Sequence, residues 1–281
     1  MRFMFAISAA IVAMFLVSYA AKAQNTEKHN SMLYPTVLVG SKGGSGSGTV
    51  IFSSLWEDGT VHTYVLTNHH VIKRAIKVAE EWDPQEGKNV EREPRQDVIV
   101  EWYQYNRQSR SIGTSTKKAK IVAYDASIDL ALVHLIDDET IIQNVAYVIP
   151  DGEEIYIFDE VWAVGAKLGK PPSPTFGFIS NLDSDLGGQR YIMASAPIVY
   201  GNSGGSLYRY SVERGRYELI GVPSAASVIP GMFSSQIVID MGFSIPMETV
   251  RDFLDENCYS PVVGGFLGPD CDGLGELSSD E

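Results

Sequence analysis

Three short segments of the chain contain the residue types of a nucleophilic hydrolase, in the order histidine, aspartate, serine. They are Leu66–Val71 (LTNHHV), Ser127–Val133 (SIDLALV) and Gly201–Gly205 (GNSGG). A serine hydroxyl is a weak nucleophile, so it needs a histidine as general base and a carboxylate that fixes the histidine tautomer. The three segments together therefore indicate acyl transfer through an activated serine.

The serine segment is the most specific of the three. Glycines surround Ser203, so the chain can turn sharply there, expose the hydroxyl and direct backbone N–H groups at a developing oxyanion. Taken alone, the pentapeptide also fits a glycine-rich surface turn with an ordinary serine. The other two segments favour Ser203 as a nucleophile.

Each remaining segment offers two candidates. His69 and His70 are adjacent, and successive side chains at a strand end point to opposite faces, so only one of them can face the nucleophile. Asp129 begins an apolar run, where a buried carboxylate is costly unless it accepts a charge-assisted hydrogen bond. Asp125 is the competing carboxylate, and we interpret it as a turn residue.

The segments, with separations of 59 and 74 residues, resemble the chymotrypsin-like (trypsin-like) serine proteases, especially the bacterial high-temperature-requirement peptidases. The resemblance covers roughly residues 36–255, without a PDZ domain after it. It implies His70 as the base, because the family places the base directly before a Val-Ile pair. It also implies Asp129 as the acid, Ser203 as the nucleophile and the N–H groups of Gly201 and Ser203 as the oxyanion hole.

The resemblance also implies the residues of the primary specificity pocket. Its base and walls would be Pro197, Ile198, Tyr200, Ser224, Ala225, Ser227, Gly242 and Ser244. No carboxylate lies at this base and no histidine follows His134, so a basic or acidic side chain at the cut site is disfavoured. We expect a small or medium apolar side chain there.

One position departs from the trypsin-type zymogens. Those proteins have an aspartate beside the nucleophile that receives a newly cut N-terminus, whereas this chain has Asn202. We therefore expect an enzyme that is competent once its signal is removed.

Short strand patterns supply the elements that must position these residues. One series lies at 36–40, 49–52, 63–66, 98–103, 119–123 and 130–135, and a second at 161–164, 176–179, 191–193, 205–208, 218–222 and 236–239. The run Lys42–Gly48 reads as a tight barrel corner where backbones approach closely, and 79–96 as a charged loop. We predict an all-β fold of two six-stranded antiparallel barrels, chymotrypsin-like, with a C-terminal α-helix whose apolar face packs on the second barrel.

The length of 281 residues fits one two-barrel unit. We expect a protease domain at 32–256, with barrel 1 at about 32–145 and barrel 2 at about 155–256, and an acidic tail at 257–281. Residues 1–23 read as a signal peptide, with an apolar run and the small residues of Ala21–Ala23 before a cleavage site at Gln24. The chain would then be exported, periplasmic or secreted; the alternative is an uncleaved membrane anchor.

Charge and cysteine content limit the partners. Cleavage would remove Arg2 and Lys22 and leave 20 basic against 35 acidic residues, which disfavours nucleic acid and anionic membranes. Cys258 and Cys271 would form a disulfide in an oxidising compartment, and no metal site or cofactor is expected. The expected partner is a polypeptide substrate, and the oligomeric state stays open. A catalytically silent binding module and an esterase-like hydrolase with the same triad are the alternatives.

Overall fold

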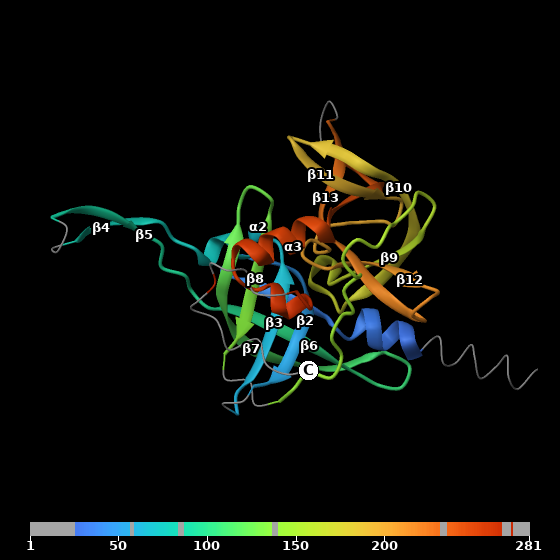
Figure 1. The fold of residues 1–281 in the computed structure, drawn as a ribbon, viewed down its shortest axis with the longest axis horizontal. Coiled ribbons are helices and arrows are strands. Elements are labelled where there is room, and N and C mark those ends of the chain that lie inside the picture. Colours follow the sequence, from blue (N-terminus) through green and yellow to red (C-terminus); the bar gives the residue numbers. More distant parts are fainter. Residues whose placement is uncertain are drawn as a thin grey trace, which may run out of the picture.

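The computed structural model describes residues 26–56, 59–83, 87–136, 140–230, 235–265 and 271. The expected signal peptide at 1–23 lies outside these residues. The described chain forms two closed antiparallel barrels of six strands each and a separate two-stranded sheet. The two barrels lie side by side (Figure 1). The predicted all-β, two-barrel fold is confirmed.

Barrel 1 has the strand order β1-β2-β3-β8-β7-β6. Its strands are β1 (Thr36–Ser41), β2 (Gly44–Leu55), β3 (Val61–Thr67), β6 (Val98–Tyr105), β7 (Ser111–Asp125) and β8 (Leu130–Leu135). Alternate residues point inward, and valines such as Val37, Val39, Val65 and Val100 form a fully buried core. β-Branched side chains suit this pleated, enclosed surface, which is why these segments form strands.

Barrel 2 has the order β10-β11-β14-β13-β12-β9. Its strands are β9 (Glu160–Gly165), β10 (Ser173–Leu186), β11 (Gln189–Ala194), β12 (Ser206–Ser211), β13 (Arg216–Pro230) and β14 (Ser235–Pro246). The helix α3 (Met247–Glu256) follows directly and buries Met247, Val250, Phe253 and Leu254, which is the apolar face predicted from the sequence.

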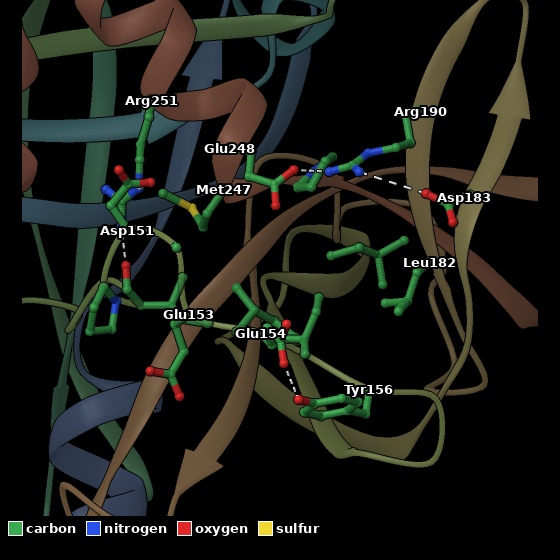
Figure 2. A pocket seen from close by; sticks show the side chains of 17 residues that line it. Asp151, Glu153, Glu154, Tyr156, Leu182, Asp183, Arg190, Met247, Glu248 and Arg251 are labelled. Atoms are coloured by element: carbon green, nitrogen blue, oxygen red, sulfur yellow. Dashed lines mark hydrogen bonds and ion pairs between the residues drawn. The ribbon is translucent and has the colours of Figure 1, made fainter.

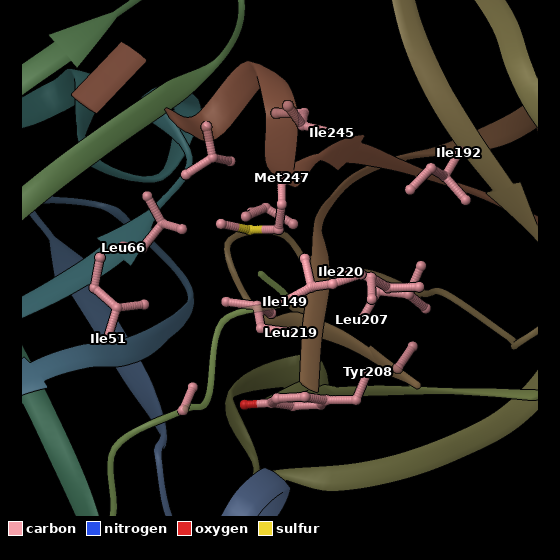
Figure 3. Close-up of a cluster of buried hydrophobic side chains, with 14 of the residues drawn as sticks. Ile51, Leu66, Ile149, Ile192, Leu207, Tyr208, Leu219, Ile220, Ile245 and Met247 are labelled. Atoms are coloured by element: carbon pink, nitrogen blue, oxygen red, sulfur yellow. The ribbon is translucent and has the colours of Figure 1, made fainter. Parts of the chain in front are cut away.

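A continuous apolar cluster fills the junction between the barrels. Ile51 and Leu66 of barrel 1 belong to the same buried cluster as Leu219 and Ile245 of barrel 2 and Met247 of α3 (Figure 3). The helix therefore packs where the two barrels meet, and not on the second barrel alone. Because this cluster is shared, the barrels are held in one relative orientation by burial of apolar surface.

The segment from 79 to 96 is not the loop that its charges predict. It contains a hairpin of β4 (Ala79–Asp83) and β5 (Lys88–Arg92), which projects away from barrel 1 (Figure 1). Its strands pair with each other and with no barrel strand, so neither face is required to be apolar. The alternation that reveals a half-buried strand in a sequence is therefore missing.

The N-terminal end of the described chain contacts both barrels. Near the N-terminus, a π-helical turn (His29–Leu33) follows Lys28, whose ammonium lies 5.1 Å from the ring centroid of Trp162 in barrel 2. The ring of His29 contacts barrel 1, with 2.9 Å between its Nδ1 and Ser109 Oγ. This turn therefore spans the barrel junction.

The sequence predicts a tail from residue 257, but its first residues are packed. A 3₁₀ turn (Ser260–Val263) follows α3, Val262 is buried, and the ring of Tyr259 lies 5.5 Å from that of Tyr64 in barrel 1. Cys258 and Cys271 form the expected disulfide. No helix in the described ranges is long and apolar enough to cross a membrane.

Candidate active site

The predicted base and acid meet at the end of barrel 1. β3 pairs with β8, so the short helix α2 (His69–Ile72), which follows β3, lies beside the turn that precedes β8. There His70 Nδ1 is 2.7 Å from Asp129 Oδ2, and the backbone N–H of His70 donates to Asp129 Oδ1 at 2.9 Å. Asp129 has a left-handed backbone with φ of 58°, and its carbonyl accepts the Asn68 side-chain amide at 2.7 Å. Its carboxylate is thus aimed at the imidazole from a fixed turn.

A third group completes the environment of this carboxylate. Ser224 on β13 of barrel 2 donates its hydroxyl to Asp129 Oδ2 at 2.6 Å. Burial acts to raise the pKa of Asp129, but the hydrogen bonds from His70 and Ser224 outweigh it and lower the pKa below its ordinary value. The sequence suggests Ser224 only as a pocket wall. Its contact with the acid is invisible there, because the two residues are 95 positions apart.

Ser203 reaches the same neighbour from the turn between β11 and β12. Its hydroxyl donates to the carbonyl of Ser224 at 3.2 Å. Within the described residues, no hydrogen bond joins Ser203 Oγ to His70. Catalytic hydrogen bonds are often long without substrate and tighten when it binds. The structure therefore brings the predicted nucleophile, acid and base together near Ser224.

The turn at Ser203 also presents backbone donors. In the described part of the chain, the N–H groups of Gly201 and Ser203 donate to no backbone or side-chain acceptor. Gly201 has φ of 95°, a conformation that side chains rarely tolerate. A Cβ there would also lie 2.6 Å from the carbonyl of Ala166, so only glycine fits. These two N–H groups are the ones expected to form the oxyanion hole.

The competing candidates have other contacts. The ring of His69 stacks on Tyr124 at 5.1 Å, and burial lowers the pKa of His69. Asp125 accepts both the N–H and the hydroxyl of Ser127 at 2.7 Å, which is the contact of a turn residue. Of the two histidines, His70 is the one whose ring bonds Asp129.

The predicted pocket residues differ in their burial and in the elements that carry them. Ile198 is buried and contacts Gly242 so closely that a Cβ on that glycine would lie 2.4 Å from Ile198 Cδ1. Pro197 accepts the Thr175 hydroxyl through its carbonyl at 2.8 Å, and Ser244 is fully buried. Tyr200 is 71% exposed and lies at the surface. Ala225 and Ser227 pair through the backbone of β13 with Phe243 and Val238 of β14.

A separate cavity of about 450 Å³ lies between the segment before β9, the β10–β11 hairpin and the start of α3 (Figure 2). Ion pairs cross its rim, between Arg190 and Glu248 and between Arg251 and Asp151. Its lining includes none of the predicted site residues. This cavity is thus distinct from the serine site. No cluster of three or more His, Cys, Asp or Glu suited to a metal occurs among the described residues.

Comparison with known families decides the classification. A model of the trypsin-like peptidase domain matches residues 46–222, which include all three residues of the proposed triad. The chain belongs to this family.

Relatives of this trypsin-like peptidase include periplasmic enzymes of bacteria. It is 27% identical over 230 residues to the periplasmic pH-dependent serine endoprotease DegQ of Escherichia coli, covering 80% of this chain and 40% of DegQ. It is 30% identical over 155 residues to a probable periplasmic serine endoprotease DegP-like of Rhizobium meliloti, covering 53% of this chain and 28% of that protein. The chain thus spans less than half the length of these relatives.

Solved structures support the fold of the trypsin-like peptidase. A serine endoprotease from Yersinia pestis aligns with a TM-score of 0.53 and 22% identity, over 83% of this chain and 65% of that one. Deg5 aligns with a TM-score of 0.54 and 22% identity, over 83% of this chain and 92% of Deg5. At this identity the likeness establishes the two-barrel fold.

Proposed function

We propose that the chain is a serine endopeptidase of exported proteins, with Ser203 as nucleophile, His70 as general base and Asp129 as the acid that orients it. The observation that carries this proposal is the position of Ser224, whose hydroxyl bonds the Asp129 carboxylate while its carbonyl accepts the hydroxyl of Ser203. Through this contact the nucleophile of barrel 2 is held next to the acid–base pair of barrel 1.

In the proposed reaction, Ser203 Oγ attacks the scissile carbonyl carbon while His70 Nε2 takes the hydroxyl proton. The carbonyl π bond breaks and its electron pair becomes an oxyanion, which the N–H groups of Gly201 and Ser203 stabilise. Collapse breaks the C–N bond, and His70 returns the proton to the leaving amine. Water then hydrolyses the acyl-enzyme, with His70 again as the base.

Asp129 stabilises the positive charge that His70 carries in the middle of each step. Because its pKa is lowered, the carboxyl stays ionised at neutral pH. Its bond to Nδ1 also leaves Nε2 as the nitrogen free to accept a proton from the nucleophile. The geometry of the pair therefore supplies both the tautomer and the charge that the reaction requires.

We infer cleavage after small or medium apolar residues. The close contact of Ile198 with Gly242 narrows the space at the predicted pocket and makes that wall apolar. None of the predicted pocket residues is charged, so a charged side chain would find no counter-ion among them. A peptide library with every residue type before the cut site tests this inference, and a preference for basic or acidic residues would refute it.

The proposed location is the periplasm or the exterior, after cleavage of residues 1–23. The names of the relatives place them in the periplasm, which supports export of this chain. Activation by an internal cut is not part of the proposal, because fully buried Asn202 offers no carboxylate to a new N-terminus. N-terminal sequencing of the exported protein together with an activity assay would settle both points.

The function is tested with the mature chain, a fluorophosphonate probe and unfolded casein. We expect the wild type to be labelled and to degrade casein, and Ser203→Ala to do neither. His70→Ala should slow labelling by about 10³-fold or more. His69→Phe, the matched control, keeps an aromatic ring on Tyr124 and should stay within about tenfold of the wild type. If the wild type is not labelled, the proposal is wrong and a catalytically silent binding module is favoured.

A further inference from the structure

Ser47 of β2 is fully buried where the glycine-rich corner of barrel 1 meets the nucleophile loop of barrel 2. Its hydroxyl donates to the carbonyl of Gly201 at 2.5 Å and accepts the N–H of Ala166 at 2.7 Å. Its backbone N–H donates to the carbonyl of Ser203 at 2.8 Å, and its own carbonyl accepts the Thr67 hydroxyl at 2.7 Å. One serine thus touches the nucleophile loop at two carbonyls.

Each backbone carbonyl from Tyr200 to Ser203 in this loop accepts a hydrogen bond. Tyr200 O accepts the N–H of Leu168 at 2.9 Å, and Asn202 O accepts the N–H of Gly205 at 2.9 Å. Ser47 holds the two remaining carbonyls, those of Gly201 and Ser203. Because N–H and C=O of one peptide point in opposite directions, bonding the carbonyls fixes where the N–H groups point.

The peptide that Ser47 holds links the two oxyanion donors. The N–H of Gly201 belongs to the peptide before it, and the N–H of Ser203 belongs to the peptide after it. If the central Gly201–Asn202 peptide rotates, the angle between the two donors changes. The hydroxyl of Ser47 also ties this peptide to Ala166, two residues before the Leu168 N–H that holds the carbonyl of Tyr200.

We propose that Ser47 is a positioning residue that holds the Gly201 and Ser203 N–H groups in the geometry of an oxyanion hole. The proposal rests on the serine endopeptidase function proposed above. Ser47 does not touch the substrate; it acts through the loop. Gly46 and Gly204 allow the backbone at Ser47 to lie close to the loop that carries Ser203. A Cβ on Gly46 would lie 2.9 Å from Ser203 O, and a Cβ on Gly204 would lie 2.3 Å from Ser47 O.

The chain offers a matched control two residues along the same strand. Thr49 is also fully buried, and its hydroxyl bonds Ser206 of barrel 2 at 2.6 Å. Thr49→Val therefore removes a buried hydrogen bond between the barrels, as Ser47→Ala does, without touching the Gly201 carbonyl. A purely structural role for Ser47 would give the two variants the same behaviour.

The experiment compares the wild type, Ser47→Ala and Thr49→Val in the mature chain. We expect Ser47→Ala to lower kcat by about 10- to 100-fold while KM changes less than about threefold, because the loss concerns the transition state. Thr49→Val should keep kcat within about threefold, although both variants melt at lower temperature.

A peptide aldehyde, whose adduct with Ser203 places an oxygen in the oxyanion hole, should lose affinity for Ser47→Ala by the same factor as kcat/KM. The matching peptide alcohol should not.

The outcomes separate the two proposals. An active wild type with equal kcat for Ser47→Ala and Thr49→Val, or an unchanged aldehyde affinity, overturns the role of Ser47 and leaves the protease function intact. A wild type that neither hydrolyses casein nor reacts with the fluorophosphonate overturns both. If Ser47→Ala does not fold, Ser47→Cys takes its place, because the thiol is only a weak donor. A wild-type kcat for Ser47→Cys would then contradict the proposal.

Discussion

At the scale of single residues, the environment of Asp129 makes stability depend on pH. Its pKa is lowered in the folded protein from an ordinary value of 3.8, so the unfolded chain binds the proton more tightly. The contribution of the carboxylate to stability is therefore complete above the unfolded value and is lost as the pH falls through the lower, folded value.

We predict that the free energy of unfolding of the wild type falls more steeply than that of Asp129→Asn as the pH drops below the ordinary pKa of 3.8. Asparagine cannot take up the proton that weakens the bonds from His70 and Ser224. Urea denaturation at a series of pH values measures the two slopes. Parallel slopes would mean that the carboxylate gains nothing from these partners.

The sequence predicts the residues of the proposed triad because each of them has a local sequence pattern. It does not predict the contact of Ser224 with Asp129 or that of Ser47 with Gly201. The two residues of these pairs lie 95 and 154 positions apart in the sequence. A serine hydroxyl leaves no periodicity, and its partners here include a backbone carbonyl, which every residue has. Such contacts emerge only when the barrels are assembled.

At the scale of elements, the β12–β13 hairpin is held by buried charges. Glu218 on β13 is fully buried and bonds Arg214 at 2.6 Å and Arg216 at 3.1 Å. Arg214 also reaches Glu153, at 3.1 Å, in the segment that leads into barrel 2. The network therefore joins the hairpin to the connection between the barrels.

We predict that Glu218→Gln destabilises the protein by about 2 kcal/mol. This is less than the cost of breaking a fully buried ion pair, because the arginines are partly exposed and water can solvate their charges. The control is Glu213→Gln, whose carboxylate is 81% exposed 3.3 Å from Arg214 and should change stability by less than about 0.5 kcal/mol. Chemical denaturation of both variants measures the difference. Equal losses of stability in the two variants would show that the burial of Glu218 does not strengthen its ion pairs.

Strand positions are predicted well where the strand is buried in the core, as in β3 and β8, in which most consecutive residues are buried. Prediction fails where that constraint is absent. The hairpin β4–β5 pairs only with itself, and β7 (Ser111–Asp125) begins well before its buried residues at 119–123. In these stretches backbone pairing, which the sequence does not encode directly, extends the strand beyond its apolar part.

At the scale of the whole molecule, the C-terminal segment links the barrels. α3 continues from β14 of barrel 2, and the residues after it reach Tyr64 of barrel 1. The disulfide Cys258–Cys271 closes this segment on itself across 13 positions. It thereby limits the freedom of the unfolded chain and holds the packed turn at Ser260–Val263.

We predict that the double variant Cys258→Ser/Cys271→Ser loses up to about 3 kcal/mol of stability and retains its kcat. The bond constrains the unfolded chain, while the contacts of the triad involve none of these residues. Calorimetry and peptide hydrolysis at 25 °C test the two parts. A strongly reduced kcat without a lower melting temperature would instead connect this segment to the active site.

The division of the proposed site between the barrels has a consequence for export. Barrel 1 contributes His70 and Asp129, whereas Ser203, Ser224 and the oxyanion donors come from barrel 2. A chain that crosses a membrane from its N-terminus presents the first half without a nucleophile. Under the proposed function, Ser203 would become reactive only when barrel 2 has closed and docked on barrel 1. The two-barrel plan would then delay proteolysis until translocation of the exported chain is complete.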